Sequence, residues 1–111
     1  MQLISVTKTQ NIPDGQMKGF TVEYKQILIA NVAGSYYAMD AVCSHMKGYL
    51  PAGTLVNNIV ICPVHRAQYD VTTGKVLKGV PMIIRLSTGQ QAKDLNAYQV
   101  VVEGDEIKVR V

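Results

Sequence analysis

The sequence is poor in aromatic residues and in strong metal ligands: it has no tryptophan, one phenylalanine, two cysteines and two histidines. Apolar residues still make up 48% of the 111 positions, so a core must be built mainly from valine, isoleucine, leucine and methionine. This length suits a single domain, residues 1–111. The longest apolar runs, such as QILIANVAG, are far shorter than the roughly 20 residues of a membrane-spanning helix, so no membrane anchor is expected.

Signals for targeting and nucleotide binding are also missing. The N-terminal segment MQLISVTKTQ is not a basic stretch followed by an apolar one, so no signal peptide is expected. Neither a G-x-G-x-x-G fingerprint nor a P-loop is present, so no nicotinamide or flavin site is indicated. We therefore expect a soluble, cytoplasmic monomer with no nucleic-acid partner. In a reducing cytoplasm, two cysteines more often bind a metal or react than form a disulfide.

The apolar residues follow a period of two, which is typical of strands. In YQVVVEGDEIKVRV the apolar side chains at positions 107, 109 and 111 share one face, and the residues from Glu103 to Glu106 supply a hairpin turn. Further turns are expected near Lys25, at Gly34 and at Thr73-Gly74. The sequence predicts an all-β domain of short antiparallel strands.

Two local expectations go beyond this pattern. Residues 88–98, TGQQAKDLNAY, are the one segment with a weak signal for a helical turn. Tyr36 and Tyr37 are neighbours on a predicted strand, so one is expected to face the core and the other the solvent.

All four cysteine and histidine residues fall into two short pairs. Cys43-x-His45 and Cys62-x-x-His65 are separated by 16 residues, a length that suits a hairpin bringing two loops side by side. Each loop then offers one thiolate and one imidazole. Thiolates favour iron–sulfur clusters and zinc, and imidazole suits either.

Other interpretations explain the two pairs less well. Coincidence is disfavoured because glycine and proline also flank both pairs, as expected of loops. A disulfide between Cys43 and Cys62 would leave both histidines unexplained and requires an oxidising compartment. Zinc is the serious competitor, although structural zinc sites usually start from cysteines two to four residues apart, which a Cys-x-His half-site is not.

The two pairs, together with GYLPAGTLVNNIVICPVH, QYDVTTGKVLKG and the ending VEGDEIKVRV, resemble Rieske proteins. The chain is similar to Rieske-type ferredoxins over nearly its whole length. The resemblance implies an antiparallel β-sandwich with an inserted cluster-binding subdomain. Here the subdomain would span roughly residues 41–81 and the base domain residues 1–40 and 82–111.

The resemblance also implies a ligand set. Cys43 and Cys62 would bind one iron of a 2Fe–2S cluster, and His45 and His65 the other. With only two thiolates the cluster is less negative than with four, so it accepts an electron more easily, at a potential of roughly −150 to +300 mV. The implied function is a soluble one-electron carrier between a donor and an acceptor protein.

As an alternative, the chain is the ferredoxin component or the small subunit of a multicomponent oxygenase or reductase. A zinc-structured binding module is a remote alternative. The chain is not expected to be an enzyme, because it has no spare histidine for the mononuclear iron of an oxygenase and no room for that catalytic domain.

Several positions near the ligands depart from relatives in the family. Val64 and Gly48 stand where membrane-anchored Rieske proteins carry an extra disulfide, and Ala67 stands where those proteins place a serine. Tyr69 matches a tyrosine whose hydroxyl donates to the sulfur of the first cysteine ligand, here Cys43.

Three further residues are expected to surround the cluster. Met46 is a candidate for shielding it from water, as apolar shells do around metal sites. Arg66 replaces the glycine of many ferredoxins. Pro81 belongs to a third loop in which Val80 is interposed.

The formal net charge of +3 comes entirely from the predicted subdomain. Residues 41–81 hold four basic residues against only Asp70, whereas the rest of the chain has seven residues of each sign. We therefore expect an acidic partner to dock on the basic residues near the ligands. These are Lys47, Arg66, Lys75 and Lys78.

Overall fold

The computed structural model describes residues 2–42, 48–64, 66–78 and 93–111. The elements in chain order are β1 (Leu3–Lys8), η1 (Thr9–Asn11), β2 (Met17–Val22), β3 (Lys25–Val32), β4 (Ser35–Asp40), η2 (Leu50–Ala52), β5 (Thr54–Val56), β6 (Ile59–Ile61), β7 (Gln68–Asp70), β8 (Val76–Lys78), β9 (Ala97–Tyr98), β10 (Val100–Glu103) and β11 (Glu106–Arg110). All strand pairs that join these elements are antiparallel. The all-β prediction is confirmed.

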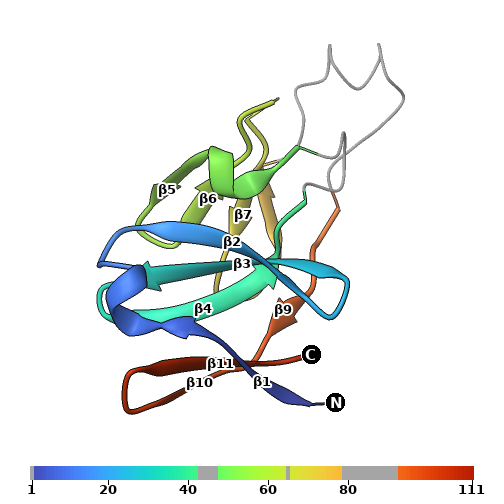
Figure 1. Ribbon diagram of the computed structural model, residues 1–111. Helices are drawn as coiled ribbons and strands as arrows, with labels where there is room; N and C mark the ends of the chain where they lie inside the picture. The colour runs from blue at the N-terminus through green and yellow to red at the C-terminus, as the bar shows by residue number, and fades with distance from the viewer. Residues whose placement is uncertain (1, 43–47, 65, 79–92) are drawn as a thin grey trace.

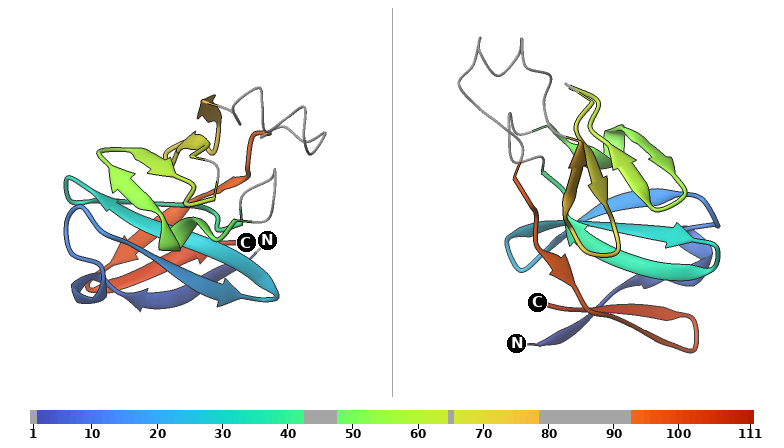
Figure 2. Two further views of the ribbon diagram at one scale, coloured as in Figure 1. Left: turned by 90° about the horizontal axis from the view of Figure 1, so that it is seen from above. Right: turned by 180° about the vertical axis from the view of Figure 1, so that it is seen from behind.

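The strands form three sheets stacked one above another (Figure 1). The bottom sheet has the order β1-β11-β10, the middle sheet β2-β3-β4-β9 and the top sheet β5-β6-β7-β8. The bottom and middle sheets combine both ends of the chain into a sandwich, as the two further views show (Figure 2). The top sheet, residues 54–78, is inserted in the sequence between β4 and β9. The subdomain boundaries at residues 41 and 81 stay a prediction.

The middle sheet is covered on both faces, which explains the sequence of β3. Ile27 and Ile29 pack into one core cluster with residues of β11, and Leu28 and Ala30 pack into a second cluster with residues of the top sheet. All four side chains are fully buried. A strand buried on both faces reads as a continuous apolar run rather than an alternating one.

This double burial corrects the expectation for Tyr36 and Tyr37 on β4. Both side chains are partly buried, Tyr36 against the cluster of the bottom sheet and Tyr37 against that of the top sheet. The alternation of β-strand side chains was predicted correctly, but solvent exposure on one face was wrong because a third sheet covers that face.

The hairpin turns lie where turn chemistry indicated. Residues 23–24 connect β2 to β3, residues 33–34 connect β3 to β4, and residues 104–105 connect β10 to β11. Gly74 takes a φ of +79° in the turn between β7 and β8, and a Cβ there would collide with the backbone oxygen of Leu95. That turn therefore needs a glycine both for its conformation and for close packing.

The predicted helical turn in residues 88–98 is not found in its described part. Residues 88–92 lie outside the described residues, residues 93–96 have no regular structure, and Ala97–Tyr98 form β9. Pairing of β9 with β4 overrides the weak local preference. Among the described residues, no helix is long or apolar enough to cross a membrane.

Candidate metal centre

The first ligand pair lies in a segment whose two ends meet. Residues 43–47, with Cys43, His45, Met46 and Lys47, lie outside the described residues. On either side of them, Val42 and Tyr49 form an antiparallel bridge. The amide of Leu50 also donates to the carbonyl oxygen of Ala41 at 2.8 Å. Ala41 and Leu50 are fully buried, so the core holds both ends of this segment in place.

The second ligand pair begins directly after β6. The amide of Cys62 donates to the carbonyl oxygen of Ala67 at 2.8 Å, and the amide of Arg66 donates to the carbonyl oxygen of Cys62 at 3.0 Å. His65 lies outside the described residues. These backbone bonds join the ends of a six-residue loop, residues 62–67.

The thiol of Cys62 faces the end of the first ligand segment. Gly48 is buried, and a Cβ built on it would lie 2.6 Å from Cys62 Sγ and 2.9 Å from Val64 Cγ2. Cys62 is a free cysteine with no solvent exposure. Cys62 forms no disulfide in the structure, and its sulfur lies against Gly48, which directly follows the first ligand segment.

The residues after the second pair divide into buried and exposed ones. Ala67 and Tyr69 are fully buried and belong to the same core cluster as Cys62 and Leu50. Val64 and Arg66 are exposed. An apolar wall behind a metal site controls solvent access and the local dielectric. Pro81 and Met46 lie outside the described residues, so their expected places around the cluster stay predictions.

A compact hydrogen-bond network holds the turn that follows the second loop. Asp70 Oδ1 accepts bonds from the amide of Thr72 at 2.9 Å, from Thr72 Oγ1 at 2.6 Å and from Asn58 Nδ2 at 3.1 Å. Partial burial raises the pKa of Asp70, but these donors outweigh it and the net pKa is lowered from 3.8. The Asp-x-Thr pattern at positions 70–72 is the sequence signal for such a turn.

A second network ties the strand that enters the first ligand segment to the chain returning at β9. Asp40 Oδ1 accepts a bond from the hydroxyl of Tyr98 at 2.6 Å, and Asp40 Oδ2 accepts one from the amide of Asn96 at 2.9 Å. The amide of Asp40 donates to the carbonyl oxygen of Asn96 at 3.0 Å. Burial of Tyr98, together with its bond to Asp40 and the charge of that carboxylate, raises the pKa of Tyr98 to about 12. We refer to these three residues as the Asp40 clasp.

Sequence reasoning missed the Asp40 clasp. Its partners are 56 and 58 residues apart in the chain, so no short-range pattern marks them. The usable signal was an acidic residue at a strand end, three residues before the first ligand.

Two of the four predicted docking residues are placed with their side chains. Arg66 and Lys75 are exposed. Lys78 ends β8, and only its backbone is described, whereas Lys47 lies outside the described residues. The expectation of a basic docking surface therefore stays a prediction.

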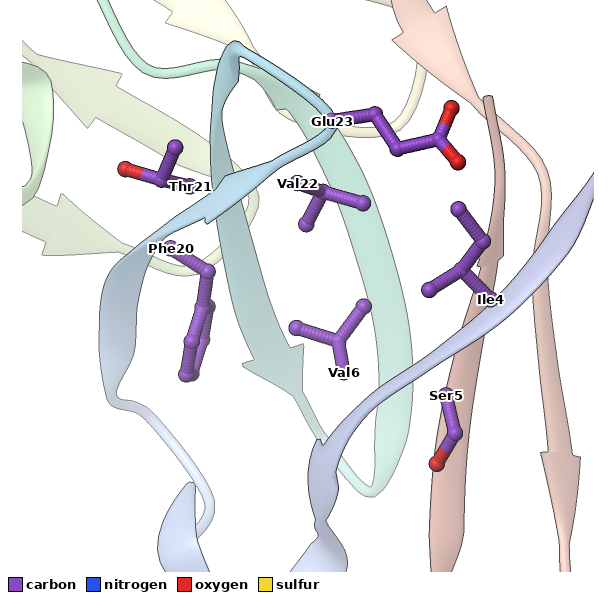
Figure 3. A pocket seen from close by; sticks show the side chains of 7 residues that line it. All are labelled: Ile4, Ser5, Val6, Phe20, Thr21, Val22 and Glu23. Carbon is purple, nitrogen blue, oxygen red and sulfur yellow. The ribbon is translucent and has the colours of Figure 1, made fainter.

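A groove lined by residues outside both ligand loops is also present. The groove lies between β1 and β2 and has a volume of about 400 Å³. Ile4, Val6 and Phe20 line it, and Glu23 lies at one end (Figure 3). It contains no cysteine or histidine. In the part of the chain with described positions, no group of three His, Cys, Asp or Glu side chains is arranged to hold a metal ion.

Comparison with known proteins identifies the family. The sequence model described as the Rieske [2Fe-2S] domain matches residues 2–104. This chain belongs to the Rieske [2Fe-2S] domain family. The match covers nearly the whole chain, as the resemblance had implied.

Similar Rieske proteins include ferredoxin components of dioxygenases. The chain is 28% identical to the ferredoxin component of a naphthalene 1,2-dioxygenase system from Pseudomonas aeruginosa, over 96% of this chain and 92% of that protein. It is 31% identical to the ferredoxin component of biphenyl 2,3-dioxygenase from Rhodococcus jostii, over 98% of this chain and 92% of that protein. The solved ferredoxin of carbazole 1,9a-dioxygenase from Nocardioides aromaticivorans superimposes with a TM-score of 0.83 at 27% identity, covering 98% of this chain and 97% of that one.

The cofactor of this Rieske domain is a 2Fe–2S cluster. The described residues fit such a group. Cys62 offers a free, buried thiol, and the absence of a Cβ on Gly48 lets its sulfur lie against the backbone there. The adjoining core cluster is apolar, which limits solvent access to such a group and lowers the dielectric around it.

Proposed function

We propose that this Rieske protein is a one-electron carrier and that Cys43, His45, Cys62 and His65 hold its cluster. The supporting observation is the position of Cys62 Sγ against Gly48, which directly follows the segment with Cys43 and His45. When bound, the cluster takes up and releases a single electron. The chain supplies two loops with closed bases that bring the two halves of the ligand set together.

The electron is expected to leave through the second loop. Val64 and Arg66, the two neighbours of His65 in the chain, are exposed, whereas Cys62 three residues earlier is fully buried. The cysteine side of the site therefore faces the core, and the histidine side is the route to a partner. A free buried thiol also suits a reducing compartment, so we propose that the carrier is a cytoplasmic monomer.

The partner that we propose is the terminal component of a multicomponent oxygenase. The similar proteins are ferredoxin components of such systems and agree with this chain over nearly their full length. Both histidines are used by the cluster, so no oxygen-activating iron site of the two-histidine type can form within this chain. Substrate chemistry therefore belongs to another protein. The alternative is a subunit bound permanently to a larger oxygenase or reductase.

We further propose that an acidic partner surface is steered by the basic residues near the ligands. Arg66 directly follows His65, and Lys75 lies in the turn after β7; both are exposed. Lys47 and Lys78 flank the same region in sequence. A cluster of one sign of charge speeds association rather than stabilising the fold.

Cofactor analysis of the purified protein tests the ligand set. Aerobically purified protein should be red-brown, bleach with dithionite and contain two irons and two sulfides per chain, and Cys62→Ser should lose the colour. Val102→Thr, a change at an exposed position of β10, is the control and should keep it. A colourless wild-type protein with stoichiometric zinc would overturn the proposal.

Electron transfer tests the partner. The reduced protein should pass one electron to the terminal oxygenase of carbazole 1,9a-dioxygenase and elute alone as a monomer in size-exclusion chromatography. Failure to reduce this oxygenase, with a cluster that remains reducible by dithionite, would contradict the oxygenase role.

A further inference from the structure

Residues 94–98, which we call the strap, join the top sheet to the middle sheet. Figures 1 and 2 show this segment, in orange, running from the level of the top sheet down to β9. At its start, Asp94 Oδ1 accepts a hydrogen bond from the amide of Val76 at 2.9 Å. The amide of Leu95 then donates to the carbonyl oxygen of Gly74 at 2.7 Å. Two successive strap residues therefore bind the β7–β8 hairpin of the top sheet.

The next strap residues bind the middle sheet. The amide of Asn96 donates to Asp40 Oδ2 at 2.9 Å, and the amide of Asp40 donates back to the carbonyl oxygen of Asn96 at 3.0 Å. The hydroxyl of Tyr98 donates to Asp40 Oδ1 at 2.6 Å, and β9 pairs with β4. The Asp40 clasp is thus the lower end of a longer connection, whose upper end is held by Asp94.

The strap is packed closely against both the hairpin and the core. A Cβ on Gly74 would collide with the carbonyl group of Leu95. The side chain of Leu95 is partly buried and packs against the core cluster that contains Cys62 and Leu50. The residue pattern of the hairpin is therefore adapted to the passage of the strap.

The upper end of the strap acts on the hairpin that continues the second ligand loop. The carbonyl oxygen of Ala67 closes that loop by accepting the bond from the amide of Cys62, and β7 begins directly after Ala67. Within the hairpin, Tyr69 of β7 is the register partner of Val76. The amide that Asp94 binds therefore belongs to the strand paired with the exit of the second loop.

The lower end of the strap acts on the strand that enters the first ligand loop. Asp40 ends β4, and the Val42–Tyr49 bridge that closes the first loop begins two residues later. Among the described residues, no backbone hydrogen bond joins the base of this loop, residues 41–42 and 48–50, to residues 62–67 of the second loop. The strap is bound beside both loops, so it contributes to their separation.

The bond made by Asp94 can be removed with little other change to the molecule. Asp94 is exposed, so its side chain contributes little to the core. Val76 lies on β8, the outer strand of the described top sheet, where an amide has no strand partner on its open side. A carboxylate acceptor makes a stronger bond to such an amide than a neutral group does.

We propose that Asp94 is a positioning residue for the cluster, which fixes the separation of the two ligand loops by holding the β7–β8 hairpin to the strap. This rests on the proposed ligand set, in which each loop supplies one ligand to each iron. A change in the separation of the loops then strains the coordination of both irons at once. Without this bond, the hairpin opens locally while the sandwich stays folded, and the cluster is lost by that route.

Asp94→Ala tests this role because it removes the acceptor. In excess EDTA, well below the unfolding temperature, the rate at which the purified protein loses its visible absorbance should rise about fivefold or more. The electron paramagnetic resonance signal of the dithionite-reduced cluster should broaden, since loops at variable separation give a range of cluster geometries. Hydrogen exchange of the Leu95 amide should also accelerate, and this measurement reports the opening independently of the cluster.

Two variants serve as controls. Asp14 Oδ1 accepts a bond from the amide of Ala33 at 2.9 Å, which is also an exposed bond between residues far apart in the sequence, but it lies at the β3–β4 turn. Asp14→Ala, compared at an equal distance below its own unfolding temperature, should release the cluster within about twofold of the wild-type rate. Asp94→Asn keeps an acceptor oxygen and should do the same.

The outcomes separate positioning from general stability. Release from Asp94→Ala that is no faster than from Asp14→Ala or wild type would overturn the positioning role and leave the carrier function intact. Asp94→Asn releasing as fast as Asp94→Ala would also overturn it, because the hydrogen bond would not be the cause. If Asp94→Ala does not fold, Tyr98→Phe, which loosens the lower end of the strap, must show the faster release or the proposal fails. A wild-type protein without a 2Fe–2S cluster would instead refute the proposed function, and the positioning role with it.

Discussion

Cys62 and Ala67 are fully buried, whereas Val64 and Arg66 between them are exposed. The loop therefore leaves the core and returns within six residues, and its two backbone hydrogen bonds are made at the buried end. A ligand at the start of such a loop is shielded, and a ligand near its tip is close to a partner. With the proposed ligand set, we therefore expect the electron to leave on the side of His65.

Gly48 is the residue that limits the position of the Cys62 sulfur. A Cβ there would lie 2.6 Å from Sγ, closer than nonbonded atoms approach, so Gly48→Ala must push the thiol out of place or move the loop. We expect the variant to hold clearly less iron than the two atoms of a full 2Fe–2S cluster, measured by iron and sulfide content. Gly34→Ala, where a Cβ meets nothing within 4 Å but φ is +91°, controls for general loss of stability. Equal iron content in Gly48→Ala and wild type would contradict this placement.

Tyr69 tests the contact expected between its hydroxyl and the sulfur of Cys43. A hydrogen bond to that sulfur strengthens when the cluster gains an electron, so it stabilises the reduced form and raises the potential. A differential of about 1 to 1.5 kcal/mol corresponds to roughly 40 to 65 mV for one electron. Tyr69→Phe should lower the midpoint by that amount, measured by spectroelectrochemical titration.

Ala67→Ser is the matched change in the opposite direction. It adds a hydroxyl donor at a buried position, and a donor to the cluster stabilises its reduced form, so the change should raise the midpoint. A Tyr69→Phe midpoint within about 10 mV of wild type, about a quarter of a kcal/mol or less, would show that the hydroxyl points elsewhere.

Strands and turns position the ligand loops by closing them at the base. The Val42–Tyr49 bridge closes the first loop, and the backbone bonds of Cys62 close the second. The Asp40 clasp then holds β4 against β9 two residues before that bridge. The strands of the top sheet have only three residues each, and they are held by pairing with one another and by buried side chains such as Val60 and Tyr69.

Tyr98→Phe tests the Asp40 clasp through pH. The pKa of Tyr98 is raised from 10.0 to about 12 by burial and by Asp40, so its contribution to folding stability is present below pH 10 and is lost as pH rises from 10 to 12. At pH 7 the variant should lose about 0.5 to 1.5 kcal/mol of unfolding free energy. Above pH 10 the gap to wild type should narrow, measured by urea unfolding. Tyr24→Phe, at an exposed ring, should show no such pH-dependent gap, and a constant gap for Tyr98→Phe would contradict the clasp.

At the scale of the whole molecule, the formal net charge and the predicted cluster ligands fall in the same segment of the chain, outside the base sandwich. The base strands and their connections carry equal numbers of acidic and basic residues, and the net charge of +3 falls in residues 41–81. The top sheet lies on one face of the middle sheet (Figure 1), and the described basic side chains next to its strand β7, Arg66 and Lys75, are exposed. Such an asymmetry orients the carrier as it approaches an acidic partner.

Ionic strength tests this orientation. The rate of electron transfer to the oxygenase should fall as salt rises from 0.01 to 0.1 M, because the Debye length shrinks from about 30 to about 10 Å. Lys75→Gln should lower the rate at low salt and flatten the dependence, measured by stopped-flow absorbance. Lys108→Gln, on β11 of the base, is the control and should leave the slope unchanged. A rate indifferent to salt would count against electrostatic steering.

The sequence by itself determined the β class, the turns at Gly34 and Gly104, the two ligand pairs and the family, because alternation, turn chemistry and short spacings are local properties. Tertiary structure decided which faces are covered: β3 is apolar on both sides and Tyr37 is partly buried because a third sheet lies over the middle one. It also decided the contact of Cys62 with Gly48 and the bond of Tyr98 to Asp40, which join residues 14 and 58 positions apart. Long-range packing brings such partners together, and no local pattern records it.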